Sequence, residues 1–370
     1  MNEKKANFKL KNGIIIVITF FVGMLSMYGI FYYFPSTIGT VVTKLEKDVT
    51  VTDQGIADAV EKLYDSVVVV NTYVNDRNYS SGTGFVYKTS KDTAYILTNN
   101  HVINNATDVY VTFTNGTIVK TKIVGSDVYS DIAVLSVDKE YATSIANIGN
   151  SEKLRLGDTV FAIGAPIDNA YSWSVTRGIV SGKDREVEVE LTSGNTKTPM
   201  VVNALQTDAA INSGNSGGPL ANANGEVIGI TSIKLASSSI EGMGFAIPIE
   251  TAIEYAEELI HGKEVKRPYL GVYMLDIADP NIYYSREYYN LIKEANVTGG
   301  VIITDVDEKS SAALAGLEKN DIIIKVDGND IASSAYLRYY LYKHKVGEEM
   351  KLTILRNNKE KDIKVKLTAN

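Results

Sequence analysis

Three short segments hold side chains that could act together on an acyl group. His101 lies in the segment LTNNHVI at 97–103, just after a run that resembles a strand. Asp131 begins the apolar run DIAVL, and Ser216 lies in the glycine-rich segment SGNSGGP at 213–219. A serine hydroxyl is a weak nucleophile at neutral pH and needs a base within hydrogen-bond reach. A histidine can be that base, and an aspartate can fix its tautomer.

The glycines around Ser216 could serve the same chemistry. They allow a backbone conformation in which successive N–H groups converge on one point. Such groups stabilise the oxyanion of a tetrahedral intermediate by about 3–4 kcal/mol per donor. Each segment alone has a structural explanation: a satisfied histidine, an aspartate that ends a turn, or a tight glycine turn. Together, in the order His–Asp–Ser, they match chymotrypsin-type triads and predict a serine nucleophile.

Composition excludes several other classes of chemistry. The 370 residues include no cysteine, which rules out thiol nucleophiles, disulfides and thiolate metal sites. The three histidines (His101, His261 and His344) lie far apart in the sequence, so we predict no metal site. No Walker-type phosphate loop is present, and we expect neither ATP nor another cofactor. The net charge is −7, and residues after 34 carry all of the negative excess, which argues against nucleic acid.

Residues 13–34 predict a membrane anchor. They read GIIIVITFFVGMLSMYGIFYYF, without a charged side chain. A helix of this length spans about 33 Å, enough for a hydrocarbon core of about 30 Å. A buried core helix and a cleaved signal peptide are the alternatives. The terminal position argues against the first, and the Tyr- and Phe-rich end, where small cleavage residues would stand, argues against the second.

The lysines of residues 1–12 predict a cytoplasmic tail before this span. We therefore expect a single-pass protein of the cell membrane, with its N-terminus in the cytoplasm. The polar residues 35–53 would form a linker, and everything after it would lie outside the cytoplasm.

Beyond residue 53 the pattern changes to short β-strands. A helical spacing over 56–64 is followed by runs that resemble strands at 67–70, 84–87 and 95–98. Asn115-Gly116 and Asn224-Gly225 are turn dipeptides of β-hairpins. Turn signals at intervals of about ten residues favour barrels or a sandwich over alternating β and α units. At 249–260 the spacing becomes helical, and Gly262 provides a stop signal.

These segments together resemble the HtrA/Deg family of trypsin-like serine proteases, over roughly residues 54–370. Residues 98–103, 130–135 and 206–220 are similar to the family's three catalytic blocks, and 242–248 to the block that closes its substrate pocket. The resemblance implies a mostly β, chymotrypsin-like domain of two perpendicular six-stranded barrels. It makes His101 the general base, Asp131 its orienter and Ser216 the nucleophile. The N–H groups of Gly214 and Ser216 would form the oxyanion hole.

The same resemblance places further residues. Ile233, Lys234 and Met243 fall near the primary specificity pocket, and Lys234 stands where many members have an apolar residue. The preference for small aliphatic side chains is therefore left open. Arg185 falls where the family has an arginine that relays activation. An arginine solvated in a charged loop is the alternative explanation.

The C-terminal residues resemble a PDZ domain. Tyr269, Leu270, Gly271 and Val272 are similar to its carboxylate-binding loop, and the blocks at 312–317 and 321–324 follow in the order of that domain. A peptide would pair along an exposed sheet edge while its terminal carboxylate meets the N–H groups of the loop. Leu270 and Val272 as ordinary core residues are the alternative. The predicted domains are a protease over 54–262 and a PDZ domain over 263–370.

The leading hypothesis is a membrane-anchored, ATP-independent endopeptidase that degrades unfolded or damaged exported proteins, with the PDZ domain binding C-terminal peptides. The resemblance also implies homotrimers. A chaperone or PDZ-based stress sensor, in which proteolysis is secondary, is the second hypothesis. An inactive scaffold is disfavoured because all three catalytic residue types are present.

Overall fold

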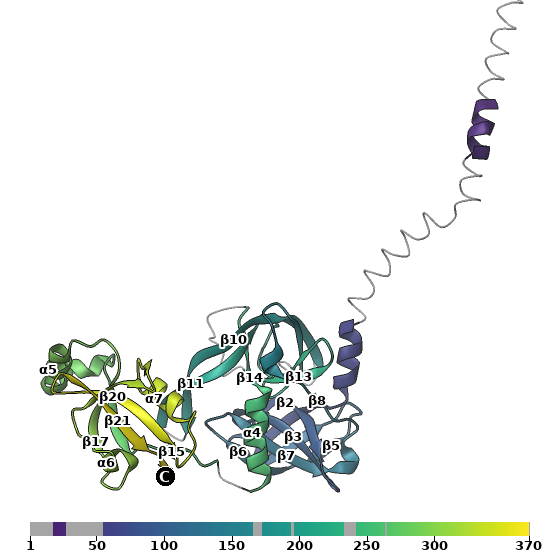
Figure 1. The fold of residues 1–370 in the computed structure, drawn as a ribbon. Coiled ribbons are helices and arrows are strands. Elements are labelled where there is room, and N and C mark those ends of the chain that lie inside the picture. The colour runs from purple at the N-terminus through teal and green to yellow at the C-terminus, as the bar shows by residue number, and fades with distance from the viewer. Residues whose placement is uncertain are drawn as a thin grey trace, which may run out of the picture. The chain divides into compact units, whose positions relative to one another are not determined.

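We describe the protein from a computed structural model, which describes residues 18–26, 55–165, 172–193, 196–232, 242–262 and 265–369 (Figure 1). The chain divides into two compact units, Met1–Asp58 and Ala59–Asn370. Residues 18–26 are helical and exposed. Most of the predicted span 13–34, together with the tail 1–12 and the linker 35–53, lies outside the described residues. Within the described ranges, no helix is long and apolar enough to cross a membrane.

The first sheet of the larger unit contains seven strands. Their order is β5-β4-β1-β2-β3-β7-β6. Its central strands carry nearly continuous apolar runs such as Val67–Val70, because the sheet is buried on both faces. The strands are β1 (Val67–Val74), β2 (Arg77–Thr89), β3 (Thr93–Asn99), β4 (Asp108–Thr112), β5 (Ile118–Lys120), β6 (Lys122–Asp127) and β7 (Ile132–Asp138), with the short helices α3 (Asn100–Ile103) and η1 (Lys139–Tyr141).

The second sheet is closed into a ring. Strand β12 pairs with both β9 and β13, so the strands β9, β10, β11, β14, β13 and β12 form a six-stranded barrel, with β8 added at one edge. Its elements are β8 (Asn147–Ile148), η2 (Ser151–Lys153), β9 (Thr159–Gly164), β10 (Ser174–Ser193), β11 (Thr196–Thr207), β12 (Pro219–Asn222), β13 (Glu226–Thr231) and β14 (Gly244–Pro248).

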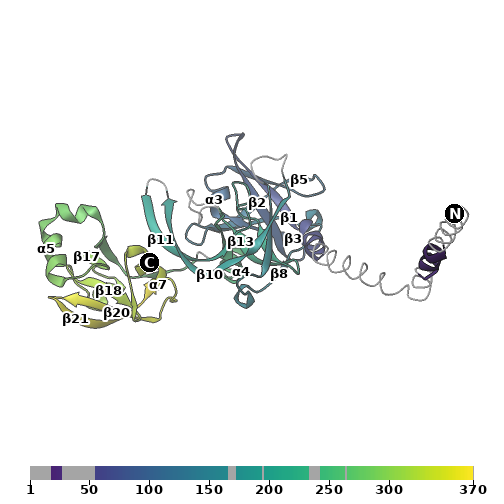
Figure 2. The ribbon, with the colours of Figure 1, turned by 90° about the horizontal axis from the view of Figure 1, so that it is seen from above.

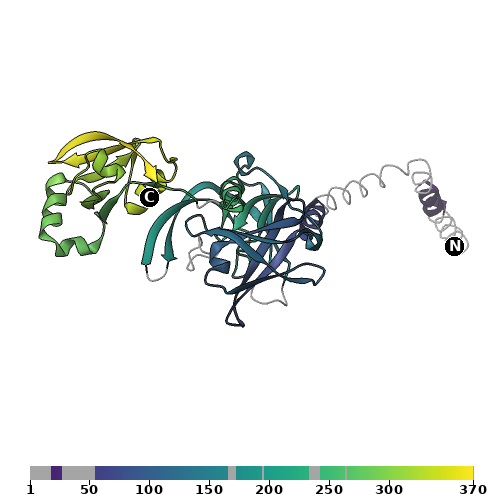
Figure 3. The same ribbon diagram turned by 90° about the horizontal axis from the view of Figure 1, so that it is seen from below.

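Strands β10 and β11 are much longer than the short strands that the sequence pattern predicts. Their pairing runs from Val180 opposite Thr207 to Ser193 opposite Thr196. They form a hairpin that extends well beyond the other strands of the sheet (Figures 2 and 3). On β10, Val187 and Val189 face the core while glutamates alternate with them on the exposed face.

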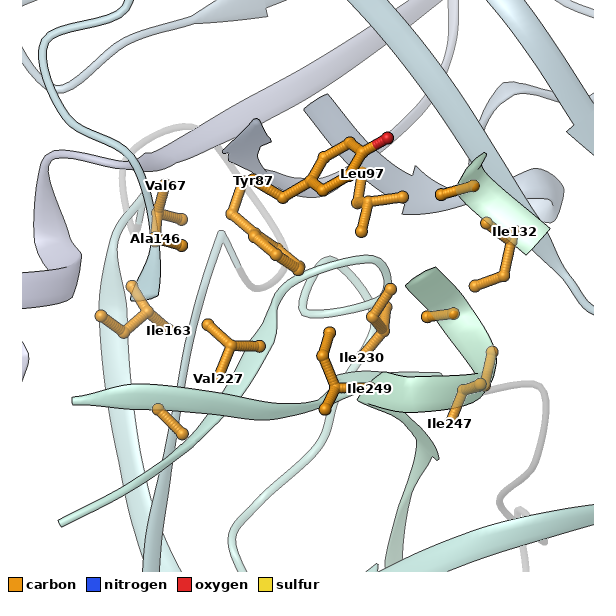
Figure 4. Packing of buried hydrophobic residues seen from close by; sticks show 14 of the residues in the cluster. Val67, Tyr87, Leu97, Ile132, Ala146, Ile163, Val227, Ile230, Ile247 and Ile249 are labelled. Carbon is orange, nitrogen blue, oxygen red and sulfur yellow. The ribbon is translucent and has the colours of Figure 1, made fainter. Parts of the chain in front are cut away.

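The main core lies between the two sheets. Figure 4 shows Val67, Tyr87 and Leu97 of the first sheet converging on Val227 and Ile230 of the second. Two helices complete this core: the one over 55–64, through Ala59 and Leu63, and α4 (Ile249–Ile260), through Ala252, Ala256 and Leu259. The predicted helix over 249–260 is thus confirmed. Because the two sheets share one core, residues at their junction are held rigidly, as a catalytic site requires.

The C-terminal module has its own core around a sheet of order β16-β17-β18-β20-β21. Asp327-Gly328 and Asn357-Asn358 form its tight turns, and all four residues have positive φ. The elements are β15 (Pro268–Tyr269), β16 (Val272–Asp276), η5 (Pro280–Tyr284), α5 (Arg286–Ala295), β17 (Val301–Val306), α6 (Ser311–Leu314), β18 (Ile322–Val326), β19 (Asn329–Asp330), α7 (Ser334–Leu341), β20 (Glu349–Arg356), β21 (Lys359–Lys366) and β22 (Thr368–Ala369).

The Tyr-rich excursion of this module forms η5 and α5. Ile302 and Ile322 point away from the module's main core, and they pack with Ile282, Tyr288 and the other apolar residues of this segment. The excursion therefore covers the second face of the sheet. Tyr284 remains 91% exposed, so packing explains only part of its aromatic content.

Candidate active site

Strand pairing brings His101 and Asp131 together. In the ladder between β3 and β7, Asn99 lies opposite Ile132. His101 therefore follows the end of one strand, in α3, while Asp131 precedes the start of the other. Asp131 has a left-handed backbone, with φ +57°. Aspartate tolerates this conformation better than most residues, and here it turns the side chain toward α3.

The Asp131 carboxylate is buried and fully engaged. Its Oδ2 lies 2.8 Å from Nδ1 of His101, and its Oδ1 accepts the His101 backbone N–H at 3.0 Å. The buried Ser232 hydroxyl donates to Oδ2 at 3.2 Å. Because a carboxylate only accepts, Nδ1 must carry a proton, which leaves Nε2 of His101 as the basic nitrogen. The His101 side chain is 25% exposed, so solvent and substrate can reach it.

The serine turn is held against the first sheet. The backbone N–H of Thr83, in β2, donates to the carbonyl of Ser216 at 2.9 Å. A Cβ placed on Gly82 would lie 2.7 Å from Val102 and 3.1 Å from the Ser216 carbonyl oxygen. The backbone of Ser216 is thus within a few ångströms of the residue that follows His101. Only a strand glycine permits this close approach.

Thr83 also orients the backbone next to Ser216. Its hydroxyl donates to the carbonyl of Gly214 at 2.7 Å and accepts the N–H of Ala165 at 3.1 Å. Gly214 has φ +100°, which a residue with a side chain rarely adopts. Among the described residues, no acceptor takes the N–H of Gly214. That N–H can therefore bind an oxyanion, in keeping with the oxyanion hole that the family resemblance implies for Gly214 and Ser216.

Sequence reasoning missed Thr83 and Ser232. Both are buried, and each supports a predicted site residue through one hydroxyl hydrogen bond. For Thr83 a signal exists, because glycines flank it on both sides in a strand, which marks a close backbone approach. We find no comparable signal for Ser232.

The predicted pocket residues are only partly described. Ile233 and Lys234 lie outside the described residues. Met243 is half-buried and packs against the main core. Next to it, a Cβ on Gly244 would lie 2.6 Å from Cγ1 of Ile211, so an apolar side chain already occupies this space.

Arg185 lies in strand β10, so it is not in a loop as one interpretation of the sequence supposed. Its side chain is exposed, and its Nε donates to Gln206 Oε1 of β11 at 3.1 Å. Gln206 is ten residues before Ser216 in the chain. The described contacts of Arg185 therefore reach the strand that leads to the serine turn.

The predicted carboxylate-binding loop turns sharply at Gly271. Gly271 has φ +77°, and a Cβ there would lie 2.1 Å from Cβ of Ser310. Leu270 is buried in the module's core, and Val272 begins β16, which is an edge strand open to pairing. The Tyr269 hydroxyl donates to Asp307 at 2.6 Å, and this hydrogen bond raises the pKa of Tyr269 above its ordinary value.

Comparison with known proteins agrees with both parts of the chain. Residues 82–230 match the trypsin-like peptidase domain, and residues 268–367 match the PDZ domain. The chain is 39% identical to "Serine protease Do-like HtrB" of Bacillus subtilis over 328 residues, which cover 85% of this chain and 70% of that protein. It is 44% identical to "Serine protease Do-like HtrA" of Lactobacillus helveticus, over 79% of this chain and 69% of that protein.

The chain spans about two thirds of the length of Bacillus subtilis HtrA, to which it is 43% identical; the match covers 79% of this chain and 64% of that protein. Among solved structures, the serine endoprotease from Yersinia pestis is 31% identical, with a TM-score of 0.61 over 85% of this chain and 98% of that one. The HtrA-type protease AlgW with a decapeptide is 27% identical, with a TM-score of 0.64 over the same shares. The chain belongs to the HtrA family of Do-like, trypsin-like serine proteases that carry a PDZ domain.

Proposed function

We propose that the protein is a membrane-anchored, ATP-independent endopeptidase that degrades unfolded or damaged exported proteins. The observation that carries the proposal is the doubly engaged carboxylate of Asp131, which holds His101 with Nε2 as its basic nitrogen. A structural histidine would not need its ring and its backbone N–H bound to one buried carboxylate. The His101 side chain is partly exposed and lies near the serine turn, which suits general-base catalysis.

In the proposed mechanism, Nε2 of His101 takes the proton of the Ser216 hydroxyl as Oγ attacks the scissile carbonyl. The N–H groups of Gly214 and Ser216 hold the oxyanion that forms. His101 then gives its proton to the leaving amine, and an acyl-enzyme remains. Water attacks the ester with His101 again as the base, which releases the new carboxylate and restores Ser216. Asp131 stabilises the imidazolium in both halves.

The PDZ domain is proposed to bind the C-terminal ends of peptides. The free edge of β16 offers main-chain pairing, and the loop at Gly271 offers N–H groups for a terminal carboxylate. AlgW, a relative from this family, has been solved with a decapeptide. A peptide array with free or amidated C-termini tests this part, because only free carboxylates should bind.

The uncharged run 13–34 supports anchoring as a single cytoplasm-to-outside span. We also propose that the chain acts as a homotrimer, as the family resemblance implies. Membrane fractionation, protease accessibility of the C-terminal module from outside the cell, and light scattering of the detergent-solubilised protein test these statements. Loss of the protein into the soluble fraction, or a monomer at working concentration, would contradict them.

The decisive experiment separates a protease from a chaperone or stress sensor. The full chain in detergent micelles is incubated with unfolded casein and, separately, with a fluorophosphonate probe. Cleavage and labelling are expected in the wild type and absent from Ser216→Ala, because the nucleophile is lost. Intact casein and no label, even after C-terminal peptides are added, would reject the protease. Protection of a client from aggregation by both forms would then favour the chaperone.

A further inference from the structure

We propose that Arg267 is a positioning residue for the catalytic aspartate, acting through Asp127 on the turn that carries Asp131. The inference rests on the proposed function and adds to it a residue from outside the serine, histidine and aspartate segments. Arg267 directly precedes β15, between α4 and the PDZ domain in the chain. Nothing in the local sequence around Arg267 marks it as part of an active site.

The pair of Arg267 and Asp127 is a buried, two-pronged ion pair. The guanidinium Nη1 donates to Oδ1 of Asp127 and Nη2 donates to Oδ2, each at 2.7 Å. The Arg267 side chain is 14% exposed and that of Asp127 is 10% exposed. By comparison, the Arg155 side chain in its pair with Asp158 is 83% exposed. Burial and parallel bonds make the Arg267 pair geometrically specific, as an exposed pair is not.

Asp127 also holds the loop between β6 and β7 through hydrogen bonds to Ser130. Its Oδ2 also accepts the Ser130 N–H at 2.7 Å and the Ser130 hydroxyl at 2.6 Å. Ser130 directly precedes Asp131. The peptide that joins them sets the φ of Asp131, which is the left-handed +57°. A side chain that accepts from Ser130 therefore helps to hold the catalytic aspartate in a conformation that its backbone would not choose alone.

Aromatic rings fix Arg267 in place. Its guanidinium carbon lies 4.8 Å from the ring centre of Tyr129, in the same loop, and 5.4 Å from that of Tyr255 in α4. The ring centre of Tyr342, which follows α7, lies 5.5 Å away, and this ring also packs edge-on against that of Tyr129. Cation–π contacts of this kind strengthen when they are shielded from water. The guanidinium thus has one position, and so does the carboxylate that it holds.

Removal of Arg267 would leave the Asp127 carboxylate buried without its counter-charge. The carboxylate would turn toward water, because an unpaired buried charge is costly. Ser130 would then lose its acceptor, and the loop could relax away from the left-handed conformation at Asp131. A shift of about 1 Å in a catalytic group costs on the order of a hundredfold in rate. Substrate binding in the pocket should be affected far less.

The test compares four variants of the full chain in detergent: R267M, R267K, D127A and the double variant D127A/R267M. We expect R267M and D127A to slow both fluorophosphonate labelling and kcat by about tenfold to a hundredfold, with KM changed less than threefold. In the D127A background, R267M should lower the labelling rate and kcat little further, because Arg267 acts on Ser130 only through Asp127. R267K keeps the charge but loses the two-pronged geometry, and should lie between wild type and R267M.

Two controls keep the result interpretable. R155M removes an exposed arginine from an ion pair in the same domain and should label at the wild-type rate. Circular dichroism at the assay temperature identifies any variant that does not fold, and R267K then replaces R267M. Wild-type labelling rates in folded R267M and R267K would overturn the inference, as would multiplicative losses in the double variant. A wild-type protein that takes no label would instead reject the proposed function itself.

Discussion

Thr83→Val tests whether one buried hydroxyl supports both the fold and the oxyanion hole. The Thr83 side chain joins the two sheets, because it donates to Gly214 at 2.7 Å and accepts from Ala165 at 3.1 Å. Valine has nearly the same shape but leaves both backbone groups without a partner in a site that is 1% exposed. At about 1–3 kcal/mol for each of the two unsatisfied groups, the variant should lose about 2–6 kcal/mol of unfolding free energy. A domain with a stability of about 5–15 kcal/mol survives all but the largest loss in this range.

The effect of Thr83→Val on catalysis follows from the same hydrogen bonds. Without them, the backbone at Gly214 can rotate, and its N–H no longer points reliably at the oxyanion. Deletion of a whole oxyanion donor costs about 10²–10³ in kcat. In Thr83→Val the Gly214 N–H is still present but is no longer held in place, so the loss should be smaller, and we expect kcat to fall by about tenfold to a hundredfold. The assay is kcat and KM on a peptide amide, with KM little changed, because the oxyanion forms only after binding.

Two variants of the same kind serve as controls. Thr121→Val also removes a buried hydroxyl, which donates to Val109 at 3.1 Å in the first sheet, away from the serine turn. It should cost stability with kcat unchanged. Thr83→Ser keeps the hydroxyl and should keep most of the activity. Wild-type kcat in Thr83→Val, or an equal loss of kcat in Thr121→Val, would refute the reasoning.

Three further variants have expected outcomes. Ser232→Ala removes the hydroxyl that donates to Asp131 at 3.2 Å; kcat should fall by several-fold to tenfold with KM unchanged, and an unchanged kcat would deny the hydrogen bond a role. Gly271→Ala would place a Cβ 2.1 Å from Ser310 at φ +77°, so fluorescence anisotropy should show no binding of C-terminal peptides, while labelling of Ser216 persists. Tyr87→Phe removes a buried hydroxyl that has no partner among the described residues, so it should raise the unfolding free energy by about 1 kcal/mol at pH 7. Burial raises the pKa of Tyr87, so above a pH of about 10 the unfolded wild type loses the Tyr87 proton before the folded wild type does. The unfolding free energy of the wild type should therefore fall with pH in this range, and the difference between Tyr87→Phe and the wild type should grow. Unfolding free energies of the two proteins that change in parallel with pH would contradict this.

Residue types and chain order predicted which residues could form a triad, because the chemistry of acyl transfer limits the choice. Helical spacing predicted the helix at 249–260, and turn dipeptides predicted the hairpin turns, since both signals are local. The support of Thr83 for Gly214 could not be predicted in this way, as the two residues lie 131 positions apart. Ser232 reaches Asp131 over 101 positions. Only the register of the two sheets decides that these groups meet.

The long hairpin of β10 and β11 shows a different limit. Residues 184–190 read DREVEVE, and the charge density suggests a loop. In the structure this run is a strand, because Val187 and Val189 alternate toward the core and the glutamates toward water. The alternation of valine and glutamate is visible in the sequence, but the high charge favours a loop over a strand in a pattern-based prediction. Arg185, which the alternative interpretation places in a charged loop, lies on a strand paired with β11.

The left-handed backbone of Asp131 connects these observations. A residue with a side chain in this conformation costs on the order of 1–2 kcal/mol, and the chain offsets it locally. Asn99 and the Asn100 N–H donate to the Asp131 carbonyl, at 2.9 and 3.0 Å, while His101 and Ser232 bind the carboxylate. Three of these four partners, Asn99, Asn100 and His101, lie at the end of β3 and in α3, and only Ser232 follows a strand of the second sheet. The first sheet can therefore orient His101, but the serine turn and Ser232 reach the pair only when the second sheet has formed. A chain in which only the first sheet has folded would hold His101 against Asp131 and still lack an active site.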